Sequence, residues 1–107
     1  MEYEVIFSEI SKHDLFEIYY YIAINDSFEK ADKLRENLEC KCMTLSKFPK
    51  RGSRIREISA ERPDILQIIY IPYIIIYKIE NKKITILSII DERRSLLTIL
   101  EDRFLNN

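Results

Sequence analysis

The chain has 107 residues, a common length for one compact domain, and 47% of them are hydrophobic and 33% charged. With a single Gly and three Pro, this composition is typical of a packed globule and excludes a disordered chain. The net charge of −1 argues against strong nonspecific attraction to nucleic acid.

The charges are unevenly distributed along the chain. Residues 1–40 contain 10 acidic and 4 basic side chains, residues 41–62 contain 2 acidic and 7 basic, and residues 63–107 contain six of each. The basic segment has two interpretations, a solvated surface balanced by acids elsewhere or a functional basic patch.

The first elements expected are a strand and a helical hairpin. Residues 2–7 alternate polar and apolar, which predicts a strand. Ser8 is placed to cap a helix that ends near Asn25, with Ile10, Leu15, Ile18 and Ile22 on its buried face. Asp26 and Glu29 resemble a capping box for a second helix. Its core stripe is expected to comprise Phe28, Ala31, Leu34, Leu38, Cys42 and Leu45.

The second half of the chain is expected to form a sheet. Pro49 ends the second helix and Gly52 permits a positive φ. Strands are predicted over residues 53–58, 65–71, 73–79 and 84–90, and the short connections among the last three favour antiparallel pairing. Ser95 is placed to cap a last helix that buries Leu96, Leu100 and Phe104. The order is β-α-α-β-β-β-β-α, an α+β fold in one domain over residues 1–107.

The sequence does not indicate a membrane protein, a secreted protein or a metal-binding protein. The first ten residues lack a positively charged start followed by an apolar stretch, so we expect a cytoplasmic protein. The most apolar run, residues 65–79, is interrupted by Gln67 and Pro72 and is too short to span a membrane. Cys40 and Cys42 point to nearly opposite faces of a helix, and His13 is distant in sequence. We expect no metal and no cofactor.

A charged cluster follows the last predicted strand in the stretch SIIDERRSL, residues 88–96. A strand leaving a core must meet water, and Asp91 or Glu92 can pair with Arg93 or Arg94 at a surface for about 0–1 kcal/mol. The alternative is a surface that contacts a partner.

A set of residues recurs along the chain in the order and spacing of a known family. The stretch SEISKHDLFEIYYYI contributes Asp14, Leu15, Ile18, Tyr21 and Ile22 on the first helix. The later positions are Pro49, Gly52, Tyr73, Ile75, Tyr77, Ile79, Arg93 and Arg94. At these positions the chain resembles the RelE/ParE family of bacterial toxins from type II toxin–antitoxin modules. The resemblance covers most of the chain and implies the RelE/ParE fold, with an N-terminal strand, an antiparallel helix hairpin and a mostly antiparallel sheet of about five strands.

Three positions depart from the family pattern. Leu66 and Ile74 occupy positions that are often arginine in the family, and Asp91 occupies one that is often histidine. The resemblance therefore leaves open a toxin of low potency that retains antitoxin binding.

The family divides into RelE-like proteins, which cleave messenger RNA on the ribosome, and ParE-like proteins, which inhibit DNA gyrase. Cleavage needs an acid and a base as well as cations for the phosphate. Arg51, Arg54, Arg56, Arg93 and Arg94 supply cations, but Asp91 has an ordinary pKa of about 3.9 and His13 is expected to be remote from the arginines. Tyr70, Tyr73 and Tyr77 are further candidates for proton transfer, although alternation places some of them in the core.

The sequence thus favours a ParE-like inhibitor over an enzyme, because a protein interface relies on aromatic and arginine anchors rather than on net charge. The expected contact residues are Arg51, Arg54, Arg56, Asp91, Arg93 and Arg94. In the ribonuclease alternative, the catalytic candidates are Arg54, Arg56, Asp91, Arg93 and Arg94. The expected partners are an antitoxin and gyrase, or an antitoxin, the ribosome and mRNA. We expect no membrane association and, without the antitoxin, no direct binding to DNA.

Overall fold

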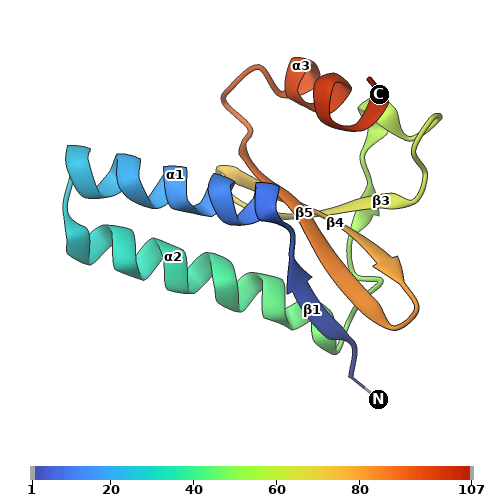
Figure 1. The fold of residues 1–107 in the computed structure, drawn as a ribbon, viewed down its shortest axis with the longest axis horizontal. Coiled ribbons are helices and arrows are strands. Elements are labelled where there is room, and N and C mark those ends of the chain that lie inside the picture. Colours follow the sequence, from blue (N-terminus) through green and yellow to red (C-terminus); the bar gives the residue numbers. More distant parts are fainter. Residues whose placement is uncertain (1, 107) are drawn as a thin grey trace.

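A computed structural model of the chain, which describes residues 2–106, has the α+β architecture that the sequence predicts (Figure 1). The strands are β1 (Glu4–Phe7), β2 (Ser53–Arg54), β3 (Ile65–Tyr70), β4 (Tyr73–Glu80) and β5 (Lys83–Asp91). The helices are α1 (Glu9–Asn25), α2 (Phe28–Met43) and α3 (Leu96–Leu100). Within the described residues, no helix is long and apolar enough to cross a membrane.

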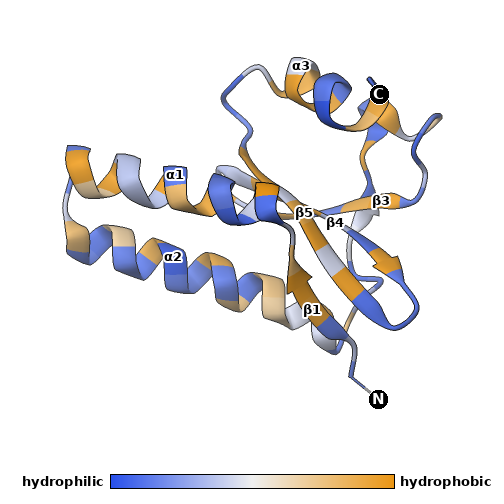
Figure 2. Ribbon diagram, viewed as in Figure 1, coloured by the Kyte–Doolittle hydropathy of each residue, from blue (hydrophilic) through white to orange (hydrophobic). Residues whose placement is uncertain are grey.

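The five strands form one sheet in the order β1-β5-β4-β3-β2. β1 pairs parallel with β5, and the other pairs are antiparallel, which confirms the predicted mostly antiparallel sheet. The turn between β4 and β5 places Asn81 and Lys82 at positive φ, and Figure 2 shows this turn as hydrophilic between mainly hydrophobic strands. A positive φ at both central residues suits the right-handed twist of a hairpin.

The sheet has a hydrophobic core on each face. On one face, the α1–α2 hairpin and the 3₁₀ turn after it pack Leu15, Leu38 and Leu45 against Tyr77, Ile84 and other strand residues. On the opposite face, α3 and the loop after β2 pack Leu100, Phe104 and Ile58 against Ile74, Ile76 and Ile90. β4 is buried on both faces, which explains why its residues are continuously apolar rather than alternating.

Helix α1 begins and ends where the sequence predicts, but α2 ends at Met43 rather than at Pro49 and is followed by a 3₁₀ turn over Thr44–Ser46. One cap and two core assignments also differ. The Ser8 side chain accepts from the Ser11 N–H and caps α1 as predicted. The predicted cap of α2 at Asp26 is wrong by one residue, because the Ser27 hydroxyl accepts from the Lys30 N–H. Ile10 and Phe28 are exposed rather than buried, since each lies at a helix end beyond the opposing core.

The segment after α2 differs most from the prediction. β2 spans only two residues, and Arg56–Ile58 form a single 3₁₀ turn instead of continuing the strand predicted over residues 53–58. Ile55 and Ile58 are both buried, and a separation of three residues brings side chains to one side in a 3₁₀ turn but to opposite sides in a strand.

Gly52 is required for a reason other than the predicted positive φ, which it does not adopt. A Cβ at this position would overlap the Tyr77 hydroxyl and approach the Gln67 carbonyl oxygen to 2.6 Å. The residue therefore permits close packing of the loop on the sheet.

The C-terminal helix buries the predicted residues. Leu100 and Phe104 are buried and Leu96 packs against them, with a π-helical turn over Glu101–Leu105 extending α3. The predicted side-chain cap by Ser95 is absent from this helix start, where the Ser95 carbonyl accepts from the Ile99 N–H.

Candidate functional site

The predicted charged cluster forms a tight turn at the end of β5. Asp91 is the last residue of the strand and lies opposite Tyr73 of β4. Its carboxylate accepts from the Arg93 backbone N–H at 2.9 Å and from Arg93 Nε and Nη2 at 3.0 and 2.7 Å. The turn is closed by the Arg94 N–H, which donates to the Asp91 carbonyl at 3.1 Å. Arg93 and Asp91 therefore form a two-pronged ion pair that fixes the turn.

A groove of about 420 Å³ separates this turn from α1. The turn and strands contribute Asp91, Arg93, Arg94, Tyr73 and Ile89, and α1 contributes Asp14, Glu17, Ile18 and Tyr21. We call it the α1–β5 groove. Helix α1 therefore forms one wall of the groove that Arg93 and Arg94 line. His13 itself does not line the groove, and its Nδ1 lies 3.2 Å from Glu17 Oε1.

Asp91 and Tyr73, which both line the groove, have shifted pKa values. Hydrogen bonding by Arg93 holds the pKa of Asp91 below its ordinary value, so this carboxylate is ionised at neutral pH. Burial, together with the charge of Asp91, raises the pKa of Tyr73 above its ordinary value, so its hydroxyl stays protonated. Neither group is poised to exchange a proton near pH 7.

The floor of the groove is held by a buried ion pair that the sequence reasoning missed. Asp14 is 7% exposed and accepts from Arg103 Nη1 at 2.7 Å and Nη2 at 3.0 Å. The same carboxylate accepts from the backbone N–H of Ile89 at 2.9 Å, beyond the part of β5 that β1 covers. Arg103 Nη1 also donates to the Ser88 hydroxyl at 3.0 Å. The sequence feature that could have indicated this ion pair is Asp14, a charged residue on the otherwise apolar face of α1.

A second groove, of about 400 Å³, lies on the opposite face of the sheet. It is lined by Arg54 of β2, by Arg56 and Glu57 from the segment after β2, by Glu92, and by apolar residues of β3, β4 and α3. We call it the β2–α3 groove. Arg51 lies apart from both grooves, where its Nη1 donates to the Thr44 hydroxyl at 2.8 Å.

The six predicted contact residues therefore occupy three places rather than one. A β-bulge near the end of β5 determines which face of the sheet Asp91 lies on. Tyr77 pairs with Ile86, but the preceding residue of β4, Ile76, pairs with Ser88. The extra residue, Leu87, shifts the alternation, so Ile86 and Ile89 both face the helical hairpin. Asp91 consequently faces the α1–β5 groove, while Glu92 faces the β2–α3 groove with Arg54 and Arg56.

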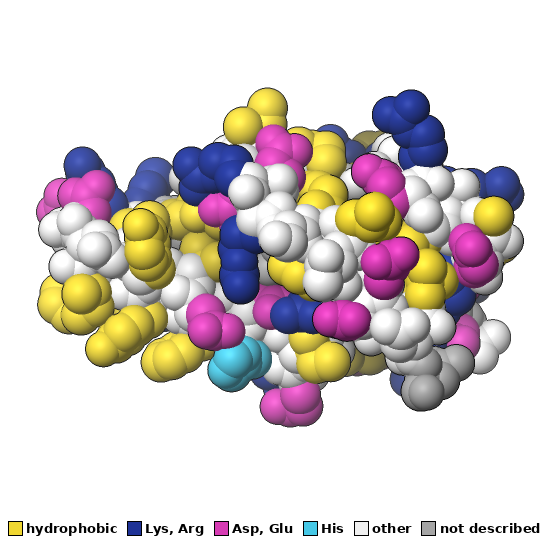
Figure 3. All heavy atoms as spheres, turned by 90° about the horizontal axis from the view of Figure 1, so that it is seen from above, with side chains coloured by type: hydrophobic (Ala, Val, Ile, Leu, Met, Phe, Trp, Pro, Cys, Tyr) yellow, Lys and Arg dark blue, Asp and Glu magenta, His cyan; other side chains and the backbone are white. Residues whose placement is uncertain are grey.

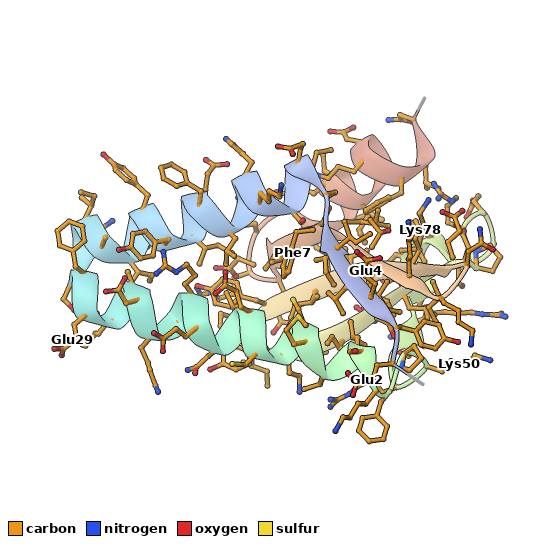
Figure 4. The ribbon with its side chains drawn as sticks, turned by 60° about the horizontal axis from the view of Figure 1, so that its bottom comes forward. Glu2, Glu4, Phe7, Glu29, Lys50 and Lys78 are labelled. Atoms are coloured by element: carbon orange, nitrogen blue, oxygen red, sulfur yellow. The ribbon has the colours of Figure 1, made fainter. Side chains whose placement is uncertain are left out.

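Charges of both signs occur at the end of the molecule opposite the helix tip. Figure 4 shows Glu29 at the tip of the helix pair, and Lys50, Lys78 and Glu2 toward the opposite end. Most of the acids of residues 1–40 belong to α1 and α2, and the basic segment 41–62 includes the loops that flank β2. Among the described residues, no group of three or more His, Cys, Asp or Glu side chains is arranged to hold a metal ion.

Comparisons with known proteins agree with this architecture. Residues 5–96 match the family model described as the ParE toxin of type II toxin–antitoxin systems, parDE. A solved structure entitled the chromosomal ParDE toxin–antitoxin system from P. aeruginosa has a chain with a similar fold, at a TM-score of 0.70 and 20% sequence identity. The alignment covers 82% of this chain and 94% of that one. Comparison with curated proteins finds no match.

Proposed function

Because the chain belongs to the ParE toxin family of type II toxin–antitoxin systems, we propose that it inhibits DNA gyrase in the cytoplasm and is neutralised by a cognate antitoxin. Inhibition would occur by contact rather than by breaking a bond. The proposed contact residues are Asp91, Arg93 and Arg94 at the α1–β5 groove, together with Arg51, Arg54 and Arg56 on the basic segment.

The main support for this proposal is that Asp91 is ionised and held by hydrogen bonds from Arg93. This carboxylate accepts three hydrogen bonds from Arg93 and has a lowered pKa, so it is a poor general acid and a weak general base. By contrast, Arg94 has no ion-pair partner among the described residues, and it lines the groove near Tyr21 and Tyr73. An unpaired arginine beside aromatic rings is typical of an anchor in a protein interface.

The direct test measures gyrase supercoiling in the presence of the purified protein. We expect inhibition by the wild type, and we expect Arg94→Ala to require about tenfold more protein, the effect of losing about 1.4 kcal/mol of contact energy. Lys33→Ala is the control, because it removes one exposed positive charge from α2. Supercoiling that continues unchanged in a large excess of the wild-type protein would refute gyrase inhibition.

Ribonuclease action is the second candidate, and the β2–α3 groove is the observation in its favour. Arg54 and Arg56 line this groove and have no ion-pair partner among the described residues, so they are available to a phosphate. Glu57 and Glu92 lie in the same groove. Messenger RNA that remains intact in a translating extract with the protein present would exclude this candidate.

A toxin of low potency is the third candidate, supported by the two positions that are often arginine in the family. Ile74 is buried in the core beneath α3, and Leu66 packs against the core beneath the hairpin. Neither position supplies a charge to a groove. Growth that is unaffected by expression, together with tight binding of the antitoxin, would support this candidate over the other two.

The antitoxin contact is proposed to include an extended segment on the outer edge of β3. β2 covers only Leu66 and Gln67 of this strand, and the exposed apolar residues Ile69, further along β3, and Ile71, just after its end, lie beyond this cover. An open strand edge with apolar neighbours suits the addition of another strand. Co-expression with the product of a neighbouring gene should yield a stable complex in which the amides of residues 68–70 exchange more slowly. If the amide exchange rates of residues 68–70 are unchanged in the complex, the antitoxin binds at another surface.

A further inference from the structure

A run of basic side chains extends from the end of α2 to the turn after β2. Residues 41–56 contain six Lys and Arg residues and no Asp or Glu. On the face of the molecule that carries α3, by comparison, Figure 3 shows acidic and basic side chains interspersed. The basic segment has two interpretations, a surface balanced by acids elsewhere or a functional patch. The ion pairs of the folded chain distinguish between them.

None of these six cations forms an ion pair with any residue in the range 2–106. By contrast, seven other Lys and Arg side chains in the same range each pair with an Asp or Glu. Five of the six unpaired cations are exposed, and we call these five, together with the exposed ring of Phe48, the basic strip. Its cations are Lys47, Lys50, Arg51, Arg54 and Arg56.

Acidic side chains lie near the basic strip without pairing with it. Glu57 and Glu92 share the β2–α3 groove with the last two arginines of the strip. Glu2 lies beside its start, where Oε1 is 3.4 Å from the hydroxyl oxygen of Ser46. Even when these three acids are counted against its five cations, the strip retains an excess of positive charge. A ligand at this surface therefore meets a positive potential.

The loop that carries the first half of the strip is held in place by hydrogen bonds. The Arg51 N–H donates to the Phe48 carbonyl at 3.2 Å, and the Tyr77 hydroxyl bonds to the backbone at Pro49 and Gly52. The second half lies along an outer edge of the sheet, because β2 is the last strand in the sheet order. A surface that is ordered before binding loses less conformational entropy when a ligand binds.

The composition of the strip fits a nucleic acid strand better than a protein or a membrane. Lysine is depleted in protein interfaces, whereas lysine and arginine both neutralise phosphates. Membrane surfaces bind amphipathic helices with a broad apolar face, and the strip lies outside α1, α2 and α3. Its one apolar side chain, Phe48, is 63% exposed between Lys47 and Lys50. An exposed aromatic ring among cations can stack on an unpaired base.

We propose that the basic strip binds single-stranded nucleic acid. Its cations contact phosphates of the strand, and Phe48 stacks on a base. The expectation that the chain alone does not bind DNA rests on the net charge of −1. A strand on the strip responds mainly to the nearby cations, because salt screens charges that are more than about 8–10 Å away. Binding of a strand is a property beyond gyrase inhibition.

Fluorescence anisotropy of a labelled oligothymidylate of about 20 nucleotides, titrated with the full-length chain, tests the proposal. This probe lacks the 2′-hydroxyl that metal-independent RNA cleavage requires, so binding is measured without cleavage and without gyrase. Five phosphate contacts predict that the affinity falls about 100-fold between about 50 and 200 mM salt, because each contact adds roughly 0.7 to the logarithmic slope.

Lys47→Ala combined with Lys50→Ala should weaken binding about tenfold or more at low salt and reduce the logarithmic slope by about 1.4. Lys33→Ala combined with Lys83→Ala is the matched control, because it removes two exposed lysines that lie on α2 and at the start of β5. The control changes the net charge equally and should alter the affinity by less than about threefold.

Phe48→Ala should weaken binding of the oligothymidylate about fivefold or more without changing the salt slope, because stacking involves no charge. Phe16→Ala is its control, since Phe16 is 62% exposed and lies on α1. A duplex of the same length should bind more weakly than the single strand, because its bases are already stacked and paired.

Circular dichroism establishes that each variant is folded, and the Phe48 variant keeps the test valid if the double lysine variant does not fold. Oligothymidylate that stays free at about 100 µM protein and about 50 mM salt overturns the proposal. A loss of affinity in the lysine control equal to that in the strip variant also overturns it. A duplex that binds as tightly as the single strand overturns the assignment to single strands. None of these results decides gyrase inhibition, because Lys47 and Lys50 are not among its proposed contacts.

Discussion

The hydroxyl of Tyr77 shows at the residue scale how a core residue positions a surface loop. Its side chain is fully buried, and Oη donates to the Pro49 carbonyl at 2.8 Å and accepts from the Gly52 N–H at 3.0 Å. Burial raises the pKa of Tyr77 above its ordinary value, so the hydroxyl remains a donor at neutral pH. This contact holds the start of the basic segment against the sheet.

Tyr77→Phe should therefore lower the free energy of unfolding by about 1–3 kcal/mol, because the partly buried Pro49 carbonyl and Gly52 N–H lose their partner. Urea denaturation followed by circular dichroism measures the loss. Tyr70→Phe removes a hydroxyl that makes no hydrogen bond within residues 2–106, and it should change stability by less than about 0.5 kcal/mol. Equal losses in the two variants would contradict this account of Tyr77.

At the scale of elements, the Asp14–Arg103 pair ties the C-terminal helix to α1 and β5. The ion pair joins side chains that are 89 residues apart, and the same carboxylate satisfies the Ile89 N–H where β1 no longer covers β5. Such a pair is expensive to break on one side, because the remaining charge stays buried without a partner.

Asp14→Asn is expected to cost about 3 kcal/mol of stability, since it leaves Arg103 without its counter-charge. Glu9→Gln, which breaks the exposed pair with Lys12 on the same helix, should cost less than about 1 kcal/mol. Chemical denaturation of both variants gives the comparison. A loss for Asp14→Asn no greater than that for Glu9→Gln would show that the buried pair does not stabilise the fold.

For the whole molecule, the two cores share β4 and β5 and so should unfold together. Leu38→Ala removes side-chain volume from the core beneath the hairpin, and Leu100→Ala does the same beneath α3. Each should cost about 2–5 kcal/mol, because both residues are fully buried. Near- and far-ultraviolet circular dichroism should report one coincident transition in both variants. A separate early transition in Leu100→Ala would show that the C-terminal helix unfolds independently of the sheet.

Local sequence patterns were sufficient for most of the elements and for the family. The polar turn at residues 80–83, the Ser8 cap and the spacing of Leu96, Leu100 and Phe104 each depend on neighbouring residues, and the structure confirms them. The strand predicted over residues 53–58 failed because alternation cannot separate a strand from a 3₁₀ turn in so short a segment. Gly52 was important for packing rather than for its φ, and only the approach of Tyr77 reveals this.

The amino-acid sequence by itself determined the element order, the mostly antiparallel sheet and the charged turn at Asp91–Arg94, because hydrophobic periodicity and turn chemistry are local properties. The tertiary structure decided which charges share a groove. The bulge at Leu87 reverses the alternation of β5, so Asp91 faces α1 while Glu92 faces Arg54 and Arg56. Side chains on both faces of β5 are largely buried from Ile84 to Ile90. The apolar residues therefore do not alternate, and the sequence does not reveal the position of the bulge.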